Sequence, residues 1–255
     1  MLPPILVTVR YSSSRLPGKC MIPVQGKPIL QHLLERVTTA NLHPVICTST
    51  DPTDDVIVEL ASKIGVEFFR GPLFNKIARW AECGQALNSE FVHIIDADDP
   101  FVDIPEILES IDEARVYDLD LLSTSDRSDR GYASVGMTLK SKFLSTLSFR
   151  VESLNSDNLD VIPWDLLLKD SDKVSKKADN VLIPDSRLNL RLTLDYETDL
   201  ELISTLIIEL GNSISRLDLE NYLELHPDLA TINSENASLF LQNKKKQLKD
   251  NFNLG

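Results

Sequence analysis

The sequence predicts an α/β fold, with a mostly parallel sheet and helices on both of its faces. Short apolar, β-favouring runs alternate along the chain with segments whose apolar residues recur at helical spacing. At 255 residues the chain can bury a full core, and its 42% apolar content is ordinary for a globular domain. We therefore expect a single domain over residues 1–255, which includes a less regular excursion at residues 126–187.

The first half of the chain supplies most of the predicted sheet. Residues 5–9 are a continuous apolar run, which is typical of a strand buried on both faces. Pro28 can begin the next helix because proline fits the first helical position, and Gly65 can end the helix after that. Further strands are expected at residues 45–48, 66–69, 91–95 and 119–124. Helices are expected from Pro28 and over residues 53–64, 75–87 and 105–115.

The second half of the chain is harder to divide into elements. Residues 126–187 are rich in Ser, Asp and Lys and show only weak periodicity. A strand is expected at residues 190–194, and a strong helix at residues 199–210. The tail from Ser234 is predicted to be a short basic helix that carries Lys244 to Lys246 on a solvated face.

Charge is distributed unevenly along the chain. The net charge of −13 argues against a nucleic-acid-binding surface, which needs a basic face to neutralise phosphates. Residues 1–34 nevertheless hold four cations and no acid, and the first acid is Glu35. Such a local positive field inside an acidic protein predicts a small anionic ligand. Chance clustering of surface charge is the alternative interpretation.

Other compositional features exclude a membrane or disulfide-rich protein. No apolar run approaches the ~20 residues that cross a bilayer, so no membrane partner is expected. The first residues lack the pattern of a secretory signal. Three widely spaced cysteines form neither a disulfide framework nor a metal-ligand pattern. A cytoplasmic location is therefore expected.

A polar loop directly after the first predicted strand combines hydroxyl groups, cations and a glycine. Its candidate residues are Arg10, Ser12, Ser13, Ser14, Arg15, Gly18 and Lys19. A triphosphate needs many hydrogen-bond donors, and cations that stay near it as charge moves to the leaving pyrophosphate, while glycine permits close backbone approach. The segment is neither a G-x-x-x-x-G-K-S/T nor a G-x-G-x-x-G loop. An ordinary surface loop is the alternative.

Three acids follow the strand expected at residues 91–95. Asp96, Asp98 and Asp99 would repel one another at a strand end without a compensating cation. Carboxylate oxygens facing phosphate are ligands that Mg2+ prefers, although a turn with capping aspartates is the alternative. Asp195, at the end of a later predicted strand, either completes a two-carboxylate site with Asp98 or is structural. No Ser/His/Asp or Cys/His arrangement is convincing.

These segments resemble the CMP-sugar synthetase family. That family includes the 3-deoxy-manno-octulosonate and acylneuraminate cytidylyltransferases and the SpsF-like spore-coat polysaccharide proteins. Residues 9–19 (VRYSSSRLPGK) are similar to the family's CTP loop. The segments GKPILQH at 26–32, CTST at 47–50, RG at 70–71, DDPF at 98–101 and LTLD at 192–195 follow in the family's order. The resemblance covers residues 5–105 and 188–204.

The resemblance implies a Rossmann-like nucleotidyltransferase sheet of the GT-A-like kind. It implies Mg2+ held by Asp98 and Asp195, and Arg10, Arg15 and Lys19 in contact with the triphosphate. Lys19, Arg15 and Asp98 are the implied catalytic residues. The further implied substrate-binding residues are Ser12, Ser13, Ser14, Gly18, Thr48, Ser49, Arg70, Arg79 and Asp99. The reaction would be attack of an acceptor oxygen on the α-phosphorus of CTP, with pyrophosphate leaving.

Departures from the family pattern concern the acceptor. Ala97 stands where relatives usually have glycine, and FNKI at 74–77 replaces an acidic stretch. A Glu-His-Val-Thr-Pro segment is missing near residues 158–163. A ulosonic acid is the first expectation, and another carboxylated sugar or a phosphonate is the next. The excursion at residues 126–187 is expected to shape the acceptor site or a homodimer contact.

Two other functions remain open from the sequence. Asp96-Ala97-Asp98 also fits the Asp-x-Asp motif with which glycosyltransferases hold Mn2+ and a nucleotide-sugar donor. The loop at residues 10–19 argues against this, because such an enzyme needs no triphosphate cradle after its first strand. A non-catalytic nucleotide-binding protein is the third hypothesis, and the joint presence of Lys19, Asp98 and Asp195 argues against it.

Overall fold

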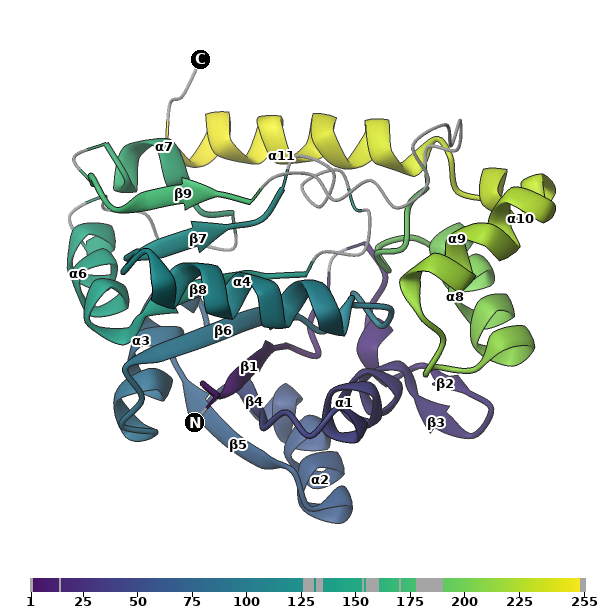
Figure 1. The fold of residues 1–255 in the computed structure, drawn as a ribbon, viewed down its shortest axis with the longest axis horizontal. Helices are drawn as coiled ribbons and strands as arrows, with labels where there is room; N and C mark the ends of the chain where they lie inside the picture. Colours follow the sequence, from purple (N-terminus) through teal and green to yellow (C-terminus); the bar gives the residue numbers. More distant parts are fainter. Residues whose placement is uncertain are drawn as a thin grey trace.

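A seven-stranded sheet forms the centre of the protein (Figure 1). The structure is a computed structural model that describes residues 2–13, 15–125, 131, 135–152, 154, 161–169, 171–177 and 190–252. The strands of the sheet are β1 (Ile5–Thr8), β4 (Pro44–Ser49), β5 (Glu67–Gly71), β6 (Phe91–Asp96), β7 (Leu121–Ser123), β8 (Met137–Lys140) and β9 (Val174–Lys176). Their order is β5-β4-β1-β6-β8-β7-β9. A small separate ribbon pairs β2 (Pro23–Val24) with β3 (Lys27–Pro28).

The sheet is mostly parallel, as predicted. Strands β5, β4, β1 and β6 run in parallel, and β7 is parallel to β9. Strand β8 is antiparallel to both β6 and β7. Because β1 and β6 are parallel neighbours, their carboxyl ends lie at one edge, with Thr8 opposite Asp96. This register brings the loop after β1 beside the acids after β6.

Helices cover both faces of the sheet, which confirms the predicted fold class. The helices are α1 (Ile29–Thr39), α2 (Asp55–Ile64), α3 (Lys76–Ala86), α4 (Ile104–Val116), α6 (Ser141–Glu152), α7 (Trp164–Leu167), α8 (Glu197–Leu210), α9 (Arg216–Leu225), α10 (Pro227–Thr231) and α11 (Asn236–Phe252). Gly65 ends α2 with a φ of 71°, the left-handed conformation that glycine adopts most readily. Among the described helices, none is both long and apolar enough to span a bilayer.

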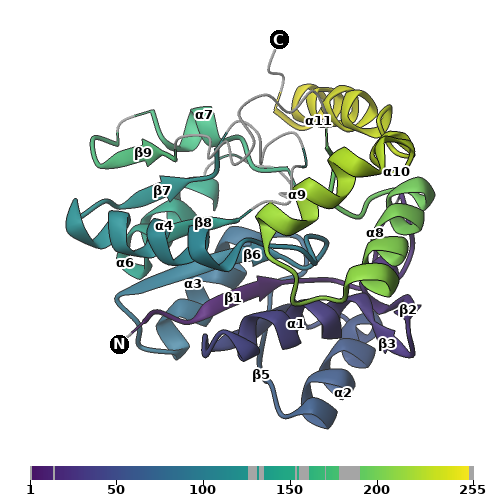
Figure 2. The ribbon, with the colours of Figure 1, turned by 45° about the vertical axis from the view of Figure 1, so that its right-hand side comes forward.

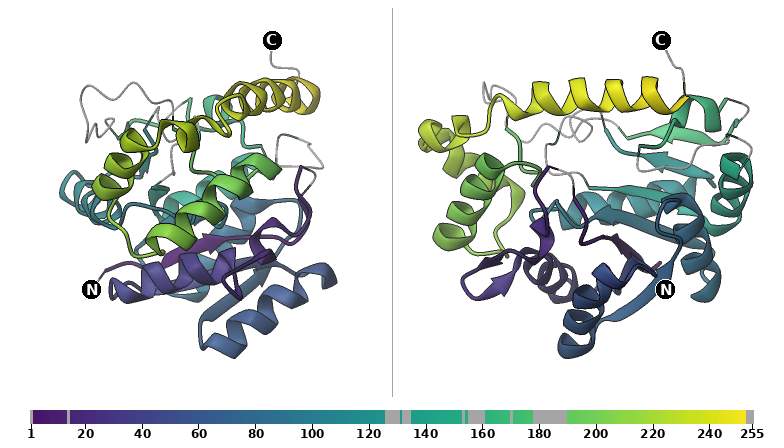
Figure 3. Two further views of the ribbon diagram at one scale, coloured as in Figure 1. Left: turned by 90° about the vertical axis from the view of Figure 1, so that its right-hand side faces the viewer. Right: turned by 180° about the vertical axis from the view of Figure 1, so that it is seen from behind.

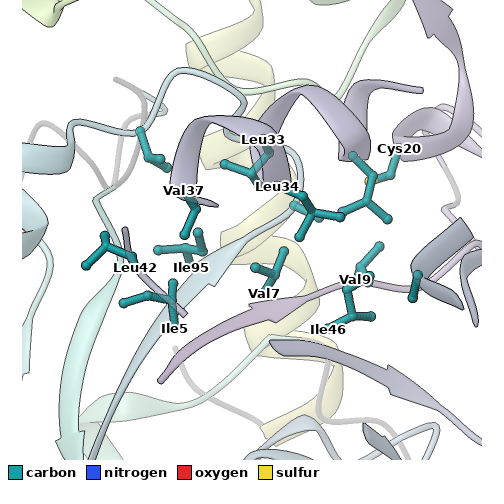
Figure 4. Close-up of a cluster of buried hydrophobic side chains, with 14 of the residues drawn as sticks. Ile5, Val7, Val9, Cys20, Leu33, Leu34, Val37, Leu42, Ile46 and Ile95 are labelled. Atoms are coloured by element: carbon teal, nitrogen blue, oxygen red, sulfur yellow. The ribbon is translucent and has the colours of Figure 1, made fainter. Parts of the chain in front are cut away.

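Two apolar layers sandwich the sheet. One joins Ile5, Val7 and Ile95 to side chains of α1, α2 and α4, and Figure 4 shows part of it. The other joins Leu6 and Ile94 to side chains of α3 and α6 on the opposite face. The alternation of Ile5, Leu6 and Val7 between the two layers explains why this strand is apolar at every position.

The segment at residues 190–194 is not a strand, so that prediction was wrong. Its residues form no strand ladder; instead Leu192 N–H donates to Gly131 O at 2.8 Å, and Leu194 N–H donates to Asp98 O at 2.8 Å. Leu190, Leu192 and Leu194 are buried in a third apolar cluster with side chains of α8 and α9. Figure 2 shows the course of these two helices. The alternating apolar side chains of this segment are therefore buried by packing against α8 and α9, and not by pairing with a neighbouring strand.

Strands β8 and β9 were not predicted, and both fall within residues 126–187. Strand β8 lies between β6 and β7, so this part of the expected excursion belongs to the central sheet. Helix α11 continues from α10 along the top of the molecule to the neighbourhood of α7 (Figures 1 and 3). Phe252 at its end packs against the apolar cluster that contains Ile162 and Leu167.

Candidate active site

The conformation of the loop after β1 is held by hydrogen bonds within the loop and to Asp54, the residue that precedes α2. Gly18 N–H donates to Tyr11 O at 3.2 Å, and Gly18 adopts a φ of 66°. A Cβ at residue 18 would lie 3.1 Å from the Tyr11 ring, so both the backbone conformation and the space favour glycine. Tyr11 N–H donates to Asp54 Oδ1 at 2.7 Å. The loop is therefore held in one conformation before Lys19.

Lys19 is the centre of the site. Its Nζ lies 2.5 Å from Asp98 Oδ2 and 2.9 Å from Asp195 Oδ1, and it donates to Leu194 O at 2.7 Å. Burial alone would lower the pKa of Lys19, but the charges of Asp98 and Asp195 outweigh it and raise the pKa. One ammonium thus joins the loop after β1 to the acids after β6 and to the segment before α8.

Asp195 is buried among cations. Its side chain is 1% exposed, and Arg15 Nη2 approaches Oδ1 at 2.5 Å while Arg191 Nη2 approaches Oδ2 at 2.5 Å. Burial would raise the pKa of Asp195, but Lys19, Arg15 and Arg191 together lower it well below its usual range. Asp199 accepts from the backbone N–H of Asp195 at 2.9 Å and fixes this segment at the start of α8.

The acids after β6 form a compact cluster. Oxygens of Asp96, Asp98 and Asp99 all lie within 4.8 Å of one another. Asp99 is buried, and its burial, with the charge of Asp98 as a further cause, raises its pKa. Thr193 Oγ1 donates to Asp99 Oδ1. Three hard oxygen donors whose mutual repulsion a cation would relieve are a set that fits Mg2+.

A cavity of about 750 Å3 opens over these residues, within the range of small-molecule sites. The predicted site residues that line it are Arg10, Ser12, Ser13, Arg15, Lys19, Arg79, Asp98, Asp99 and Asp195. Ser14 lies outside the described residues. The nitrogens Arg15 Nε, Trp80 Nε1 and Arg191 Nη1 are buried with no hydrogen-bond partner among the described residues. Because such unsatisfied donors are costly, they support a ligand in this cavity.

Four other predicted residues lie outside the cavity lining. Gly18 acts through the loop backbone, and Thr48 Oγ1 and Ser49 Oγ both donate to Asp54 Oδ2, at 2.9 and 2.5 Å. Arg70 binds the Asp55 carboxylate at 2.7 Å and the backbone carbonyls of residues 49 and 51. Through Asp54, which accepts from the loop backbone, Thr48 and Ser49 support the loop; their contact with substrate stays a prediction.

Several cavity residues were missed by the sequence analysis. The Arg191–Asp195 pair at a spacing of four residues was a usable signal, because the segment LRLTLD carries both charges. Helix α11 had no such signal, yet Phe240, Lys244 and Gln247 line the cavity at helical spacing. The Phe240 ring centroid lies 5.6 Å from Arg15 Cζ and 5.2 Å from Arg191 Cζ. The predicted solvated basic tail is therefore partly a wall of the cavity.

Curated relatives resemble the first half of the chain. The 3-deoxy-manno-octulosonate cytidylyltransferase of Anaeromyxobacter dehalogenans (strain 2CP-1) is 32% identical over 110 residues, which are 42% of this chain and 44% of that protein. The spore coat polysaccharide biosynthesis protein SpsF of Bacillus subtilis is 30% identical over 115 residues, 43% of this chain and 48% of that protein. The chain thus aligns with less than half the length of these relatives.

Solved structures with the same fold match nearly the whole chain. A cytidylyltransferase from Leptospira borgpetersenii superposes with a TM-score of 0.77 at 23% identity, over 90% of this chain and 97% of that one. A CMP:2-keto-3-deoxy-manno-octonic acid synthetase complexed with CTP gives a TM-score of 0.60 at 15% identity, over 81% and 99% of the two chains. The family model described as cytidylyltransferase matches residues 5–133, about half of the chain. The chain belongs to the cytidylyltransferase family.

Proposed function

We propose that the protein transfers CMP from CTP to a small acidic acceptor and releases pyrophosphate. The observation that carries the proposal is the position of Lys19, whose ammonium joins Asp98 to Asp195 in a cavity lined by the loop after β1. Membership of the cytidylyltransferase family supports CTP as the nucleotide. Arg15 and Lys19 are the cations that would neutralise the triphosphate as charge moves to the leaving pyrophosphate.

The loop after β1 would bind the phosphates, and little proton transfer is required of the protein. Ser12 and Ser13 offer hydroxyl donors to the cavity, and Arg10 offers a guanidinium. The fixed loop backbone positions these donors before substrate arrives, so catalysis would rest on orientation and charge neutralisation. His93 lies fully buried in β6, donates to Val135 O and has its pKa lowered by burial, so it fits a structural role.

Asp98 is proposed to hold Mg2+ with Asp195, and Asp96 and Asp99 lie beside Asp98. When bound there, Mg2+ would supply positive charge to phosphate oxygens. In the structure, Lys19 and Arg15 both bind the same oxygen of Asp195. For Asp195 to bind Mg2+, these two side chains must therefore turn from its carboxylate toward the phosphates. The two cations would then exchange a carboxylate partner for a phosphate partner, which keeps their charge compensated.

A carboxylated sugar, with a ulosonic acid first, is the proposed acceptor. A relative at 32% identity is named for 3-deoxy-manno-octulosonate, but its similarity covers only 42% of this chain. The cavity continues beyond the nucleotide loop to Val161, Ile162 and Trp164, which lie within the segment expected to shape the acceptor site. A homodimer through residues 126–187 stays a prediction.

The first experiment measures thermal stabilisation by CTP, UTP, ATP and GTP with Mg2+, because a ligand that binds only the folded state raises its stability. We expect a selective shift with CTP that Lys19→Met abolishes and Lys27→Met retains. Lys27 is a matched control, because its ammonium forms an exposed ion pair with Glu35 at 2.8 Å and neither residue belongs to the cavity lining. Pyrophosphate release is then measured with 3-deoxy-manno-octulosonate and other sugar acids.

A different pattern of stabilisation would contradict the proposed function. Indifference to all four triphosphates, together with stabilisation by a UDP-sugar or GDP-sugar and Mn2+, would exclude a cytidylyltransferase. It would favour a glycosyltransferase that uses Asp96 and Asp98 as an Asp-x-Asp metal site.

A further inference from the structure

Helix α11 forms one wall of the cavity, and its cavity-facing residues follow helical spacing. Phe240, Lys244 and Gln247 line the cavity, whereas the neighbouring Lys245 and Lys246 lie outside the lining. The helix is anchored at its start by Asn236, whose Nδ2 donates to Asp199 Oδ1 and Thr198 Oγ1 at 2.8 Å each. It is anchored at its other end by Phe252, which packs against the cluster around Ile162. Both anchors fix which face of α11 meets the cavity.

The other cationic side chains of the cavity lining all interact with groups of the protein. Arg15, Lys19 and Arg191 are bonded to the Asp195 carboxylate. The other arginines of the lining already donate to backbone carbonyls of residues 72 and 73. Lys76 lies over the Trp80 ring at 5.3 Å, and its charge acts on Asp96.

Lys244 has no such partner. No hydrogen bond or ion pair joins its ammonium to any described residue, although its side chain is partly buried in the cavity wall. A cation of the cavity wall that pairs with none of the described residues can pair with an anionic ligand. The four cavity carboxylates all lie at the end of β6, directly after it or before α8, at the cation-rich nucleotide end.

The position of Lys244 along α11 indicates which anion it meets. Phe240 contacts Arg15 and Arg191, and Lys244 lies one turn, about 6 Å, farther along the helix axis. That direction leads away from the nucleotide loop and toward the end of α11 that packs near Ile162 and Trp164, as Figures 1 and 3 show for the course of the helix. Lys244 is thus displaced from the triphosphate cations toward the part of the cavity proposed for the acceptor.

We propose that Lys244 on α11 binds the carboxylate of the acceptor and makes the site selective for acids. The inference rests on the proposed function and deepens it, because it assigns the acidity of the acceptor to one side chain. Gln247, one turn farther along the same face, adds an amide that can bind a hydroxyl of the same molecule. Neither residue lies in the segment that matches the family model, residues 5–133, so this acid-binding contact would be a feature of the C-terminal helix.

The test measures acid binding apart from chemistry. Wild type, Lys244→Met, Lys244→Arg and Lys245→Met are saturated with α,β-methylene-CTP and Mg2+, and then titrated calorimetrically. The titrants are 3-deoxy-manno-octulosonate, N-acetylneuraminate and glucuronate, each beside its methyl ester. Lys245→Met is the matched control, since it removes the same charge from the adjacent, exposed position.

We expect Lys244→Met to weaken binding of the acid by about tenfold or more, the effect of losing a charge-assisted hydrogen bond. Lys244→Arg should retain most of the affinity, and Lys245→Met should equal wild type. Esterification should weaken binding to wild type but make little further difference to Lys244→Met, because the two changes remove the two partners of one contact.

Other outcomes separate this inference from the proposed function. A Lys244→Met protein that binds the acid as wild type does would overturn the inference alone. Loss of affinity for the CTP analogue in that variant would overturn it too, by placing Lys244 at the triphosphate. A wild type that holds the analogue but none of the acids would refute a carboxylate acceptor. Failure to bind the analogue at all would instead refute the proposed function.

Discussion

At the scale of single residues, the ammonium of Lys19 holds the site together through ion pairs with two carboxylates. Its ammonium is 2.5 Å from Asp98 and 2.9 Å from Asp195, whose side chain is only 1% exposed. Removing the ammonium would leave Asp98 without its cation and Asp195 with only Arg15 and Arg191, and breaking such a buried ion pair costs about 3–5 kcal/mol. The network of Arg15, Lys19 and Arg191 around Asp195 therefore stabilises the fold as well as the site.

We predict that Lys19→Met lowers the free energy of unfolding by about 3 kcal/mol, since Asp98 and Asp195 lose their shared cation. Lys27→Met should lower it by less than about 1 kcal/mol, because the Lys27–Glu35 pair is exposed and screened by solvent. Urea denaturation of both variants in the absence of nucleotide measures the difference. Equal losses in the two variants would show that the buried pair contributes no more than a surface one.

The burial of His93 predicts how the stability of the protein depends on pH. Its Nε2 donates to Val135 O at 2.7 Å, so the neutral ring accepts from Thr138 Oγ1 through Nδ1 at 2.9 Å. Burial lowers the pKa of His93 to about 4, below its usual 6.5. Between these values the unfolded chain binds a proton that the folded protein does not, so stability falls as the pH falls from 6.5 to 4.

The stability lost through His93 over that window is about 3 kcal/mol at most. We expect His93→Gln to be less stable than wild type at pH 7 but to lose less stability on acidification. Urea denaturation of both proteins at pH 7, 6, 5 and 4.5 measures the two slopes. Parallel slopes would mean that His93 is protonated in the folded protein, contrary to its buried contacts.

At the scale of elements, strand β8 depends on a glycine that brings it against β6. Gly136 has a φ of 77°, and a Cβ there would lie 1.9 Å from Ile94 O. Gly65, at the end of α2, has a similar φ of 71° but open space around it. The two glycines therefore separate the cost of the backbone conformation from the cost of a steric clash.

We predict that Gly65→Ala costs about 1 kcal/mol, from the left-handed backbone alone. Gly136→Ala should cost at least about 3 kcal/mol, because the clash with β6 adds overpacking to the same strain. Thermal and urea unfolding of the two variants gives both values. Similar losses would mean that β8 can move away from β6 without disturbing the sheet.

The elements also show what could and could not be predicted from the sequence. Strands β1, β4 and β6 were predicted because each is a continuous apolar run, and their parallel order follows from the helices between them. Strand β8 was missed, because antiparallel pairing with β6 across more than 40 residues leaves no local periodicity. Residues 190–194 alternate like a strand, but α8 and α9 bury their apolar side chains instead.

The candidate site also contains residues that could be predicted from the sequence and residues that could not. Lys19 and Asp98 follow strands that are parallel neighbours, so the meeting of their segments could be predicted from strand ends alone. Asp195 also reaches this edge, although no strand carries it, because Leu194 N–H donates to Asp98 O. Phe240 and Lys244 could not be predicted, since the packing of α11 is set by distant contacts at its two ends.

At the scale of the whole molecule, the cavity differs in charge from the protein around it. The chain carries a net charge of −13, yet the cavity lining holds seven cationic side chains and four carboxylates. The acidic exterior disfavours polyanions, while the cavity favours a small anion that can enter it. Segments far apart in the sequence build this cavity: the loop after β1, the acids after β6, the residues before α8, and α11.

Because CTP and the acceptor would together touch all four segments, their joint binding should order the four segments together. We predict that α,β-methylene-CTP, Mg2+ and 3-deoxy-manno-octulosonate together slow amide hydrogen exchange at residues 10–19, 96–99, 191–196 and 240–247, and leave α9 unchanged, since α9 contributes no residue to the cavity lining. Exchange is measured by mass spectrometry on peptides from wild type and Lys19→Met at equal nucleotide concentration. Lys19→Met should lose the protection in all four segments, not only near residue 19, because its ammonium joins three of them. Protection confined to residues 10–19 in wild type would mean that the nucleotide binds the loop without engaging the carboxylates, which would leave Asp98 and Asp195 outside the site.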